Sequence, residues 1–298
     1  MRIFSEFADG ADAGRPESRS DRIRANLADV GATLLIASAK GGVGKSIITA
    51  NVGAALARRG KKIAIVDADL NSPSIIAMLG MKQPRGLPLV EGIEPAAGPH
   101  GLRVISSDLL ASVEPPPVAF VEPENEPPPT APARPTATRE SDALFQMLTQ
   151  ARLGSLDFAL VDLAPGIEDL YAVAGMVRPH GIVMVSHSSA QSVRATQQAV
   201  RVARRIDVPV VGLIENMAGF NCDGCRSVRP LMPEGNLAGA ASDLELPVIG
   251  RLPFDPRLAE ASDRGRLFIH EFADSPLAKL LVEIATTIER LAAAPRRE

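Results

Sequence analysis

The seven residues from Lys40 to Ser46, KGGVGKS, constrain the fold of this chain more than any other stretch. A short apolar run at 33–38 precedes them, and apolar residues at helical spacing follow them up to Arg59. We interpret these flanks as a buried strand and as a helix that stops at Gly60. A strand, a glycine-rich turn and the start of a helix form the context of a phosphate-binding loop.

The residue types in this loop suit a nucleoside triphosphate. Glycines allow backbone N–H groups to surround phosphate oxygens, and the start of the helix adds a favourable dipole. Lys45 would supply positive charge to the β- and γ-phosphates, and the Ser46 hydroxyl is placed to bind Mg²⁺. We therefore predict ATP and Mg²⁺ as ligands; a glycine-rich turn without a ligand is the alternative. The predicted nucleotide contacts are Gly41, Gly42, Val43, Gly44, Lys45 and Ser46.

A second lysine distinguishes this loop from the ordinary pattern. Position 39, where the ordinary pattern has glycine, is Ala39, and Lys40 follows it. The loop resembles the deviant phosphate loop of the dimeric ATPases that include the Min, Par, nitrogenase iron-protein and Mrp families. The resemblance implies that Lys40 reaches the partner's nucleotide in a homodimer, where a second cation would neutralise charge during phosphoryl transfer. A solvated loop lysine is the alternative.

Composition excludes several classes of partner. The 298 residues are 46% hydrophobic, enough for one large α/β domain or two small ones. Aromatic residues make up 3% and the net charge is −3, which argues against both base stacking and a basic nucleic-acid surface. No apolar run approaches the ~20 residues of a membrane span. We expect no nucleic-acid or membrane partner and a cytoplasmic location.

Apolar strands alternate with helices along most of the chain. Besides 33–38, we predict strands at 62–67, 102–106, 158–162, 181–186, 208–214 and 246–250, and helices at 46–59, 141–153, 191–205 and 276–293. Continuous apolar strands of this kind indicate a parallel sheet that is buried on both faces. The predicted fold is therefore a doubly wound, mostly parallel α/β sheet with helices on both faces.

Three segments lie outside this pattern. Residues 1–28 are polar and predict a flexible leader, in which 23–27 could form a helical turn, and residues 294–298 form a tail. Between Glu114 and Pro135 the chain has nine prolines, which predict an extended, polyproline-like insertion into the domain at 29–293. This insertion is either a disordered surface segment or a docking segment for a partner.

Carboxylates follow two of the predicted strands. Asp67 and Asp69 follow one strand and Asp162 ends another, and the carboxyl ends of parallel strands meet at one sheet edge. We assign Asp162, with Ser46 and Asp67, to the Mg²⁺ shell. Of Asp67 and Asp69, we expect one to orient water and one to support the metal, so both join Lys40 and Lys45 as catalytic candidates. Each aspartate alone could instead cap a loop.

Cys222 and Cys225 are the two cysteines of the chain, in the sequence CDGC. Two thiolates from one turn can bind a metal ion, but Zn²⁺ and iron–sulfur sites usually need four ligands. A two-fold dimer would complete the set. A redox pair and two inert thiols are the alternatives.

Five motifs in order resemble the Mrp/ApbC family of P-loop ATPases, which carry iron–sulfur clusters. They are KGGVGKS at 40–46, VDAD with PS at 66–74, VDLAPG at 161–166, ENM at 215–217 and GRLPFDP at 250–256. The resemblance covers about residues 30–290. It implies an ATP-hydrolysing homodimer that holds a [4Fe–4S] cluster on Cys222 and Cys225 of both subunits and passes it to client apoproteins. It further implies that Asn216 contacts the adenine edge and that Pro253 and Phe254 pack against the base.

The chain also departs from the family, and the departure at 162–169 bears on hydrolysis. Where the family has D-x-P-P-G-T-G-D, residues 162–169 are DLAPGIED, which lacks the threonine hydroxyl and adds Glu168. We expect this change to slow ATP hydrolysis. The predicted function is an ATP-dependent iron–sulfur carrier. The alternatives are a Min/Par-type positioning ATPase and a nucleotide-binding scaffold bridged by zinc or a cluster.

Overall fold

An eight-stranded sheet forms the centre of the computed structural model, which describes residues 19–82, 92–109, 136–221, 227–232 and 235–292. The strand order is β10-β7-β6-β1-β5-β2-β4-β3, and every pair is parallel except β3 with β4. This arrangement confirms the predicted parallel sheet. The strands are β1 (Val30–Ala37), β2 (Ile63–Ala68), β3 (Ala96–Ala97), β4 (Arg103–Ser106), β5 (Leu156–Leu163), β6 (Gly181–Ser186), β7 (Val210–Glu215) and β10 (Val248–Arg251).

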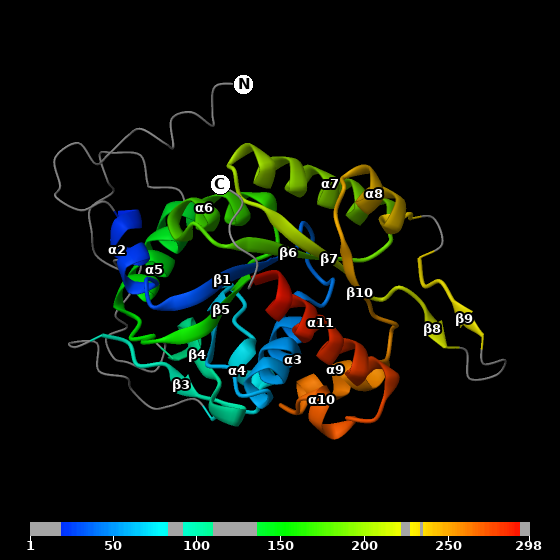
Figure 1. The fold of residues 1–298 in the computed structure, drawn as a ribbon, viewed down its shortest axis with the longest axis horizontal. Helices are drawn as coiled ribbons and strands as arrows, with labels where there is room; N and C mark the ends of the chain where they lie inside the picture. The colour runs from blue at the N-terminus through cyan, green and yellow to red at the C-terminus, as the bar shows by residue number, and fades with distance from the viewer. Residues whose placement is uncertain (1–18, 83–91, 110–135, 222–226, 233–234, 293–298) are drawn as a thin grey trace, which may run out of the picture.

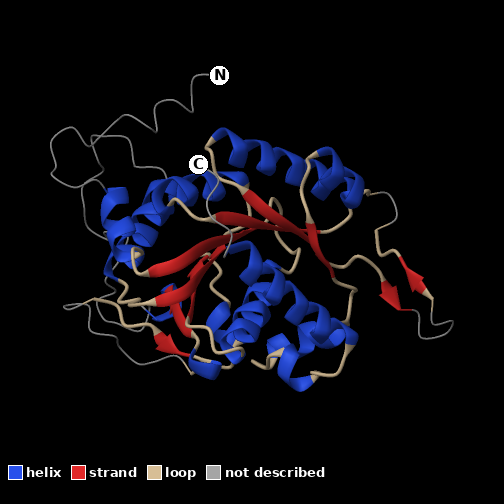
Figure 2. Cartoon of the chain, in the orientation of Figure 1, coloured by secondary structure: helices blue, strands red, loops and turns tan. Residues whose placement is uncertain are grey.

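Helices cover both faces of the sheet, as predicted (Figures 1 and 2). On one face lie α3 (Lys45–Arg58), α4 (Ile75–Met78), α9 (Pro256–Asp263), α10 (Phe268–Glu271) and α11 (Pro276–Ala292). On the other lie α2 (Arg19–Asn26), α5 (Thr136–Gln150), α6 (Ile167–Val177), α7 (Ala190–Arg205) and α8 (Leu237–Asp243). Two short 3₁₀ turns, η2 (Pro99–Gly101) and η3 (Ser107–Leu109), flank β4.

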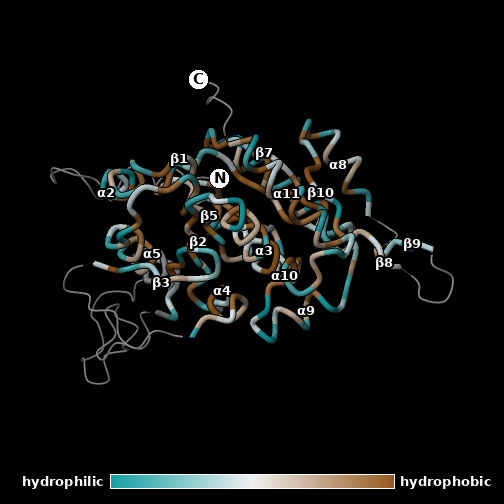
Figure 3. Tube along the Cα trace, turned by 60° about the horizontal axis from the view of Figure 1, so that its bottom comes forward, coloured by the Kyte–Doolittle hydropathy of each residue, from teal (hydrophilic) through white to brown (hydrophobic). Residues whose placement is uncertain are grey.

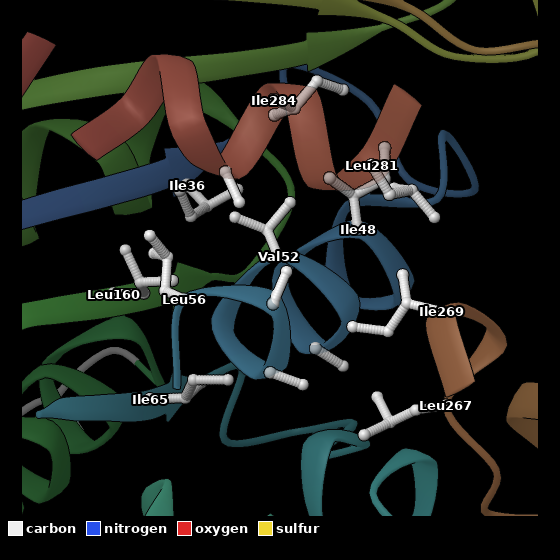
Figure 4. Close-up of a cluster of buried hydrophobic side chains, with 14 of the residues drawn as sticks. Ile36, Ile48, Val52, Leu56, Ile65, Leu160, Leu267, Ile269, Leu281 and Ile284 are labelled. Carbon is white, nitrogen blue, oxygen red and sulfur yellow. The ribbon is translucent and has the colours of Figure 1, made fainter. Parts of the chain in front are cut away.

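Each face of the sheet has its own apolar core. Along β1, Leu34 and Ile36 pack into the core under α3, whereas Leu35 packs into the core on the opposite face. Helices α3 and α11 pack against each other on the same face of the sheet, and Val52 of α3 lies in the apolar cluster that they share (Figure 4). In Figure 3, hydrophobic segments of the chain, coloured brown, accordingly lie along the strands of the sheet. Burial of each such side chain stabilises the fold by about 1.5–3 kcal/mol.

Helix α2 occupies part of the segment that was predicted to be a flexible leader, so that prediction is wrong for residues 19–28. Its Ile23 is fully buried and Leu27 is nearly so, against α5 and α6. The Asn26 side chain also donates hydrogen bonds to the carbonyl oxygens of Leu148 (2.6 Å) and Ala151 (2.7 Å). Residues 19–28 are therefore part of the folded domain. The segment is mostly polar, but Ile23 and Leu27 are buried in the core and the Asn26 amide binds carbonyl oxygens at the end of α5.

Several predicted segments lie outside the described residues. They are the first 18 residues of the leader, the proline-rich insertion and the C-terminal tail. Among the residues that the structure describes, no helix has both the length and the apolar character needed to cross a bilayer.

A two-stranded hairpin projects away from the body of the domain (Figure 1). Its strands are β8 (Phe220–Asn221) and β9 (Val228–Arg229), which pair antiparallel, with Phe220 opposite Arg229. Residues 222–226, including both cysteines, connect these strands in the sequence and lie outside the described part of the chain. The hairpin follows directly from the β7 end of the sheet.

Candidate nucleotide site

The loop from Lys40 to Gly44 connects β1 to α3, as predicted. Gly42 and Gly44 have positive φ angles of 77° and 84°, a conformation that strains other residues. At Gly44 a Cβ would also lie 2.4 Å from Nδ2 of Asn216. Gly44 is thus required both by its backbone conformation and by the close approach of a neighbouring side chain.

The carboxylate of Asp162 is the centre of a buried polar cluster at the start of α3. It is fully buried, and its Oδ2 lies 2.8 Å from Nζ of Lys45 and accepts a 2.6 Å hydrogen bond from Oγ of Ser46. The Lys45 ammonium in turn donates to Oγ of Ser46 (3.2 Å). The structure therefore brings together three of the predicted nucleotide and Mg²⁺ residues.

Thr49 completes this cluster and was not predicted from the sequence. Its Oγ1 donates to Oδ1 of Asp162 (2.7 Å) and to the Lys45 carbonyl oxygen (3.0 Å). Residues four apart lie on the same face of a helix, so Lys45 and Thr49 both face β5. That spacing was the signal available in the sequence.

Asp67 lies beside Asp162, since the two are register partners on the neighbouring strands β2 and β5. Its fully buried carboxylate accepts hydrogen bonds from the backbone N–H groups of Ser74 (2.9 Å) and Ile75 (3.1 Å). Burial, and secondly the charge of Asp162, raise the pKa of Asp67 to about 7, although the two N–H groups act in the opposite direction. Asp67 thus orders the loop that follows β2.

Asp69 is less enclosed. Its Oδ1 accepts a hydrogen bond from the Ser72 N–H (3.1 Å), and burial raises its pKa above the ordinary value. Asp69 directly follows the end of β2, at the same edge of the sheet, and it is partly exposed. The predicted division of roles between Asp67 and Asp69 stays a prediction.

Lys40 contacts a helix of its own chain. Its Nζ donates a 2.7 Å hydrogen bond to Oε1 of Gln191, in the first turn of α7. Half-buried His187 lies close enough that the Lys40 charge contributes to lowering its pKa, after burial, which is the larger cause. The predicted contact of Lys40 with a partner's nucleotide stays a prediction.

Asn216 links the phosphate loop to the end of β7. Its Nδ2 donates to the Val43 carbonyl oxygen (2.8 Å), and its backbone N–H donates to Ser186 on β6 (2.8 Å). Phe254 is 42% exposed, and its backbone N–H donates to the Gly219 carbonyl oxygen (2.7 Å). The predicted contacts of Asn216, Pro253 and Phe254 with the base stay predictions.

Glu215, which the sequence analysis named only within the ENM motif, is a buried charge whose partner was not predicted. Its carboxylate lies 2.7 Å from Nε of Arg251 and accepts a hydrogen bond from the Ser188 hydroxyl. The ion pair ties the end of β7 to the end of β10, just before Asn216 and before the Pro253–Phe254 segment. An acidic residue at the end of an apolar strand was the available signal.

The variant segment at 162–169 lies against the phosphate loop. The N–H of Gly166 donates to the Ser38 carbonyl oxygen (2.9 Å), and a Cβ on Gly41 would lie 3.7 Å from the Pro165 ring. Gly166 has a φ of 137°, and Glu168 and Asp169 occupy the first turn of α6. Glu168 therefore lies in the first turn of a helix close to the site, where the helix dipole stabilises its negative charge.

Comparison with known proteins identifies relatives over most of the chain. Residues 29–289 match the family model ParA, described as "NUBPL iron-transfer P-loop NTPase". An iron-sulfur cluster carrier protein of Saccharolobus solfataricus is 31% identical over 258 residues, 86% of this chain and 82% of that protein. The cytosolic Fe-S cluster assembly factor NUBP2 of Bos taurus is 33% identical over 267 residues, 88% of this chain and 94% of that protein.

A solved structure supports the same conclusion about the fold. A nucleotide-binding protein from Archaeoglobus fulgidus in complex with ADP superposes with a TM-score of 0.68 at 28% identity. The match covers 87% of this chain and 95% of that one. The central sheet, the phosphate loop and the flanking helices are therefore those of a P-loop NTPase.

Proposed function

Because the chain belongs to the NUBPL iron-transfer family of P-loop NTPases, as the resemblance predicted, we propose that it is an ATP-dependent iron–sulfur cluster carrier. In this proposal ATP binds at the Lys40–Ser46 loop. A homodimer holds a [4Fe–4S] cluster as cargo on Cys222 and Cys225 of both subunits. The cluster then passes to client apoproteins.

The observation that carries the nucleotide part is the arrangement around Asp162. Lys45 is 6% exposed and its ammonium is already fixed beside the loop by an ion pair with a buried carboxylate. Such a cation is oriented before the nucleotide arrives, so little side-chain entropy is lost when it binds phosphate. The loop glycines leave the backbone N–H groups free to approach the phosphate oxygens.

The donor set also fits Mg²⁺. The Ser46 hydroxyl and the carboxylates of Asp162 and Asp67 offer hard oxygen ligands at one sheet edge, the type that Mg²⁺ prefers. Bound there, Mg²⁺ would neutralise negative charge on the phosphates. It would also favour the ionised form of Asp67, whose pKa is otherwise raised.

Hydrolysis requires a water molecule in line with the γ-phosphate. Water attacks the γ-phosphorus, the bond to the ADP oxygen breaks, and inorganic phosphate leaves. Partly exposed Asp69 or buried Asp67 would orient this water, and Lys40 of the other subunit would stabilise the charge that develops. Glu168 adds negative charge near the site, which is consistent with slow hydrolysis.

Asn216 supports coupling between the nucleotide and the cysteines. Its side chain contacts the phosphate loop, and Cys222 follows six residues later in the chain. Between them, the Ala218 N–H donates to the Leu252 carbonyl oxygen (2.9 Å), which ties this segment to the residue after β10. A movement of the loop on ATP binding would therefore be passed directly to the start of the β8–β9 hairpin.

Cluster transfer tests this proposal. Protein reconstituted anaerobically with iron and sulfide is mixed with an apo-form [4Fe–4S] enzyme, and the recovered activity of that enzyme is followed. We expect transfer in wild type to depend on nucleotide, and no transfer from Cys222→Ala. Zinc binding without transfer would favour the scaffold. Nucleotide-dependent assembly without iron or zinc would favour the positioning ATPase.

A further inference from the structure

His100 and His270 lie side by side on the surface, although 170 residues separate them in the sequence. His100 belongs to η2, and His270 belongs to α10, and both elements pack against α3. The two Nε2 atoms are 2.9 Å apart, and the ring planes are nearly perpendicular, at 82°. Neither residue belongs to the phosphate loop or the cysteine pair.

The distance between the nitrogens matches two ligands of one metal ion. With metal–nitrogen bonds of about 2.0–2.1 Å, two nitrogens at a right angle around an ion are about 2.9 Å apart, and at a tetrahedral angle about 3.4 Å. The ring centroids are 4.7 Å apart, less than a linear N–H···N bond of 2.9 Å plus two ring radii would give. The two ring axes are therefore bent away from the line that joins the nitrogens, as binding of one ion by both nitrogens requires.

We propose that His100 and His270 form a transition-metal site, in which both Nε2 atoms bind one Cu²⁺ or Ni²⁺ ion. Right-angled nitrogen ligands suit the square-planar or tetragonal geometry that these ions prefer. Within the described residues, no group of three or more His, Cys, Asp or Glu side chains gathers as a metal centre. Water molecules complete the coordination at this exposed position.

Both histidines are mounted on fixed backbone. His100 has a left-handed φ of 56°, which costs free energy in a residue other than glycine, and the turn is closed by the Leu102 N–H on the Pro99 carbonyl oxygen (3.0 Å). Next to His270, the Ile269 N–H donates to Oδ1 of buried Asn51 on α3 (3.2 Å). The ligand nitrogens are therefore positioned before a metal arrives.

Burial and nearby positive charge both act on His270. Burial, followed by the neighbouring His100 and Arg58, lowers the pKa of His270. Arg58, in the last turn of α3, also repels a cation. Replacement of Arg58 by glutamine should therefore tighten metal binding severalfold.

The site is tested in a Cys222→Ser, Cys225→Ser background without a polyhistidine tag. Calorimetric titration with Ni²⁺ or Cu²⁺ should give one site per chain. The thermal midpoint should rise with metal, because an ion that binds only the folded state stabilises it. In the Cu²⁺ complex, electron paramagnetic resonance should show coupling to two nitrogen ligands.

Replacement of either ligand should remove the site. His100→Asn tolerates the left-handed backbone and His270→Ala is exposed, so both should fold with the metal-free thermal midpoint little changed. Each should weaken metal binding at least about tenfold, since loss of even an outer-shell partner has such an effect. As the matched control, His180→Asn should bind metal like the background protein. Metal binding that is absent from the background protein, or retained in both ligand variants, would show that the pair forms only a hydrogen bond.

Discussion

Thr49 Oγ1 donates a 2.7 Å hydrogen bond to Oδ1 of Asp162, so the helix that follows the phosphate loop is joined to β5 at a buried carboxylate. Both residues are almost fully buried. The bond holds Oδ1 of Asp162, whereas Lys45 and Ser46 contact Oδ2. Thr49 therefore orients the carboxylate on which both the predicted Mg²⁺ site and the lysine depend.

Thr49→Val tests this role. The variant keeps the branched shape but removes a donor from a buried charge, so we expect the free energy of unfolding to fall by about 1–3 kcal/mol. Thr49→Ser, which keeps the hydroxyl, is the matched control and should lose less. Urea unfolding measures both, and equal stability of the two variants would contradict the structural role of the hydroxyl.

Lys45→Ala should lose most of the affinity for ATP, because the ammonium next to the loop is the charge that the phosphates require. Calorimetric titration with ATP and Mg²⁺ measures the loss, after circular dichroism has confirmed the fold. Lys61→Ala is the control, since Lys61 pairs with Glu289 on the surface and should not affect binding. Unchanged ATP affinity in Lys45→Ala would refute the nucleotide assignment.

Lys40→Ala should behave differently from Lys45→Ala. If Lys40 acts across a dimer, its removal should leave ATP affinity largely intact and lower the rate of hydrolysis. Gln191→Ala breaks the observed contact to Lys40 but keeps the lysine, so it should retain hydrolysis. Steady-state phosphate release measures all three proteins, and a wild-type rate in Lys40→Ala would exclude the proposed role.

Asp67 predicts a pH dependence of stability. Its folded-state pKa of about 7 lies above the ordinary value of 3.8, so between these values the folded state binds more protons than the unfolded state. Its contribution is therefore fully present below about pH 4 and is lost as the pH rises through about 7. The total change is at most about 4 kcal/mol, since one pKa unit corresponds to about 1.4 kcal/mol.

Asp67→Asn removes this dependence and keeps an acceptor oxygen for the Ser74 and Ile75 N–H groups. Unfolding in urea is compared for both proteins between pH 4.5 and pH 8. We expect wild type to lose stability relative to the variant across that range. Parallel curves would show that Asp67 is already ionised in the folded protein at low pH.

Much of the fold could be predicted from local sequence. Long apolar runs such as 181–186 coincide with strands, and the apolar stripe at 276–293 is α11, because burial on a sheet face requires those patterns. Short helices were missed, including α8, whose sequence LAGAASD has no clear apolar stripe. For helix α2 only a helical turn at 23–27 was expected, because just two apolar residues, Ile23 and Leu27, stand among polar and charged ones.

The candidate site was likewise predictable from the sequence only in part. The loop residues are adjacent in sequence and follow a pattern, so Lys45 and Ser46 were predictable, and Asp162 was predictable from its place at the end of a strand. The Glu215–Arg251 ion pair and the His100–His270 contact join distant elements, which no local pattern reveals. Tertiary contacts of this kind need the structure.

The central claim is that two chains share one cluster on Cys222 and Cys225. Each chain has two cysteines, so a four-thiolate site requires two subunits. The direct measurement is native mass spectrometry of anaerobically reconstituted protein, with iron and sulfide analysis of the same sample. We expect about four iron and four sulfide ions per dimer, and a Cys222→Ala, Cys225→Ala variant that binds ATP but no cluster. A cluster on a monomer, or a cluster retained in the double variant, would contradict the account.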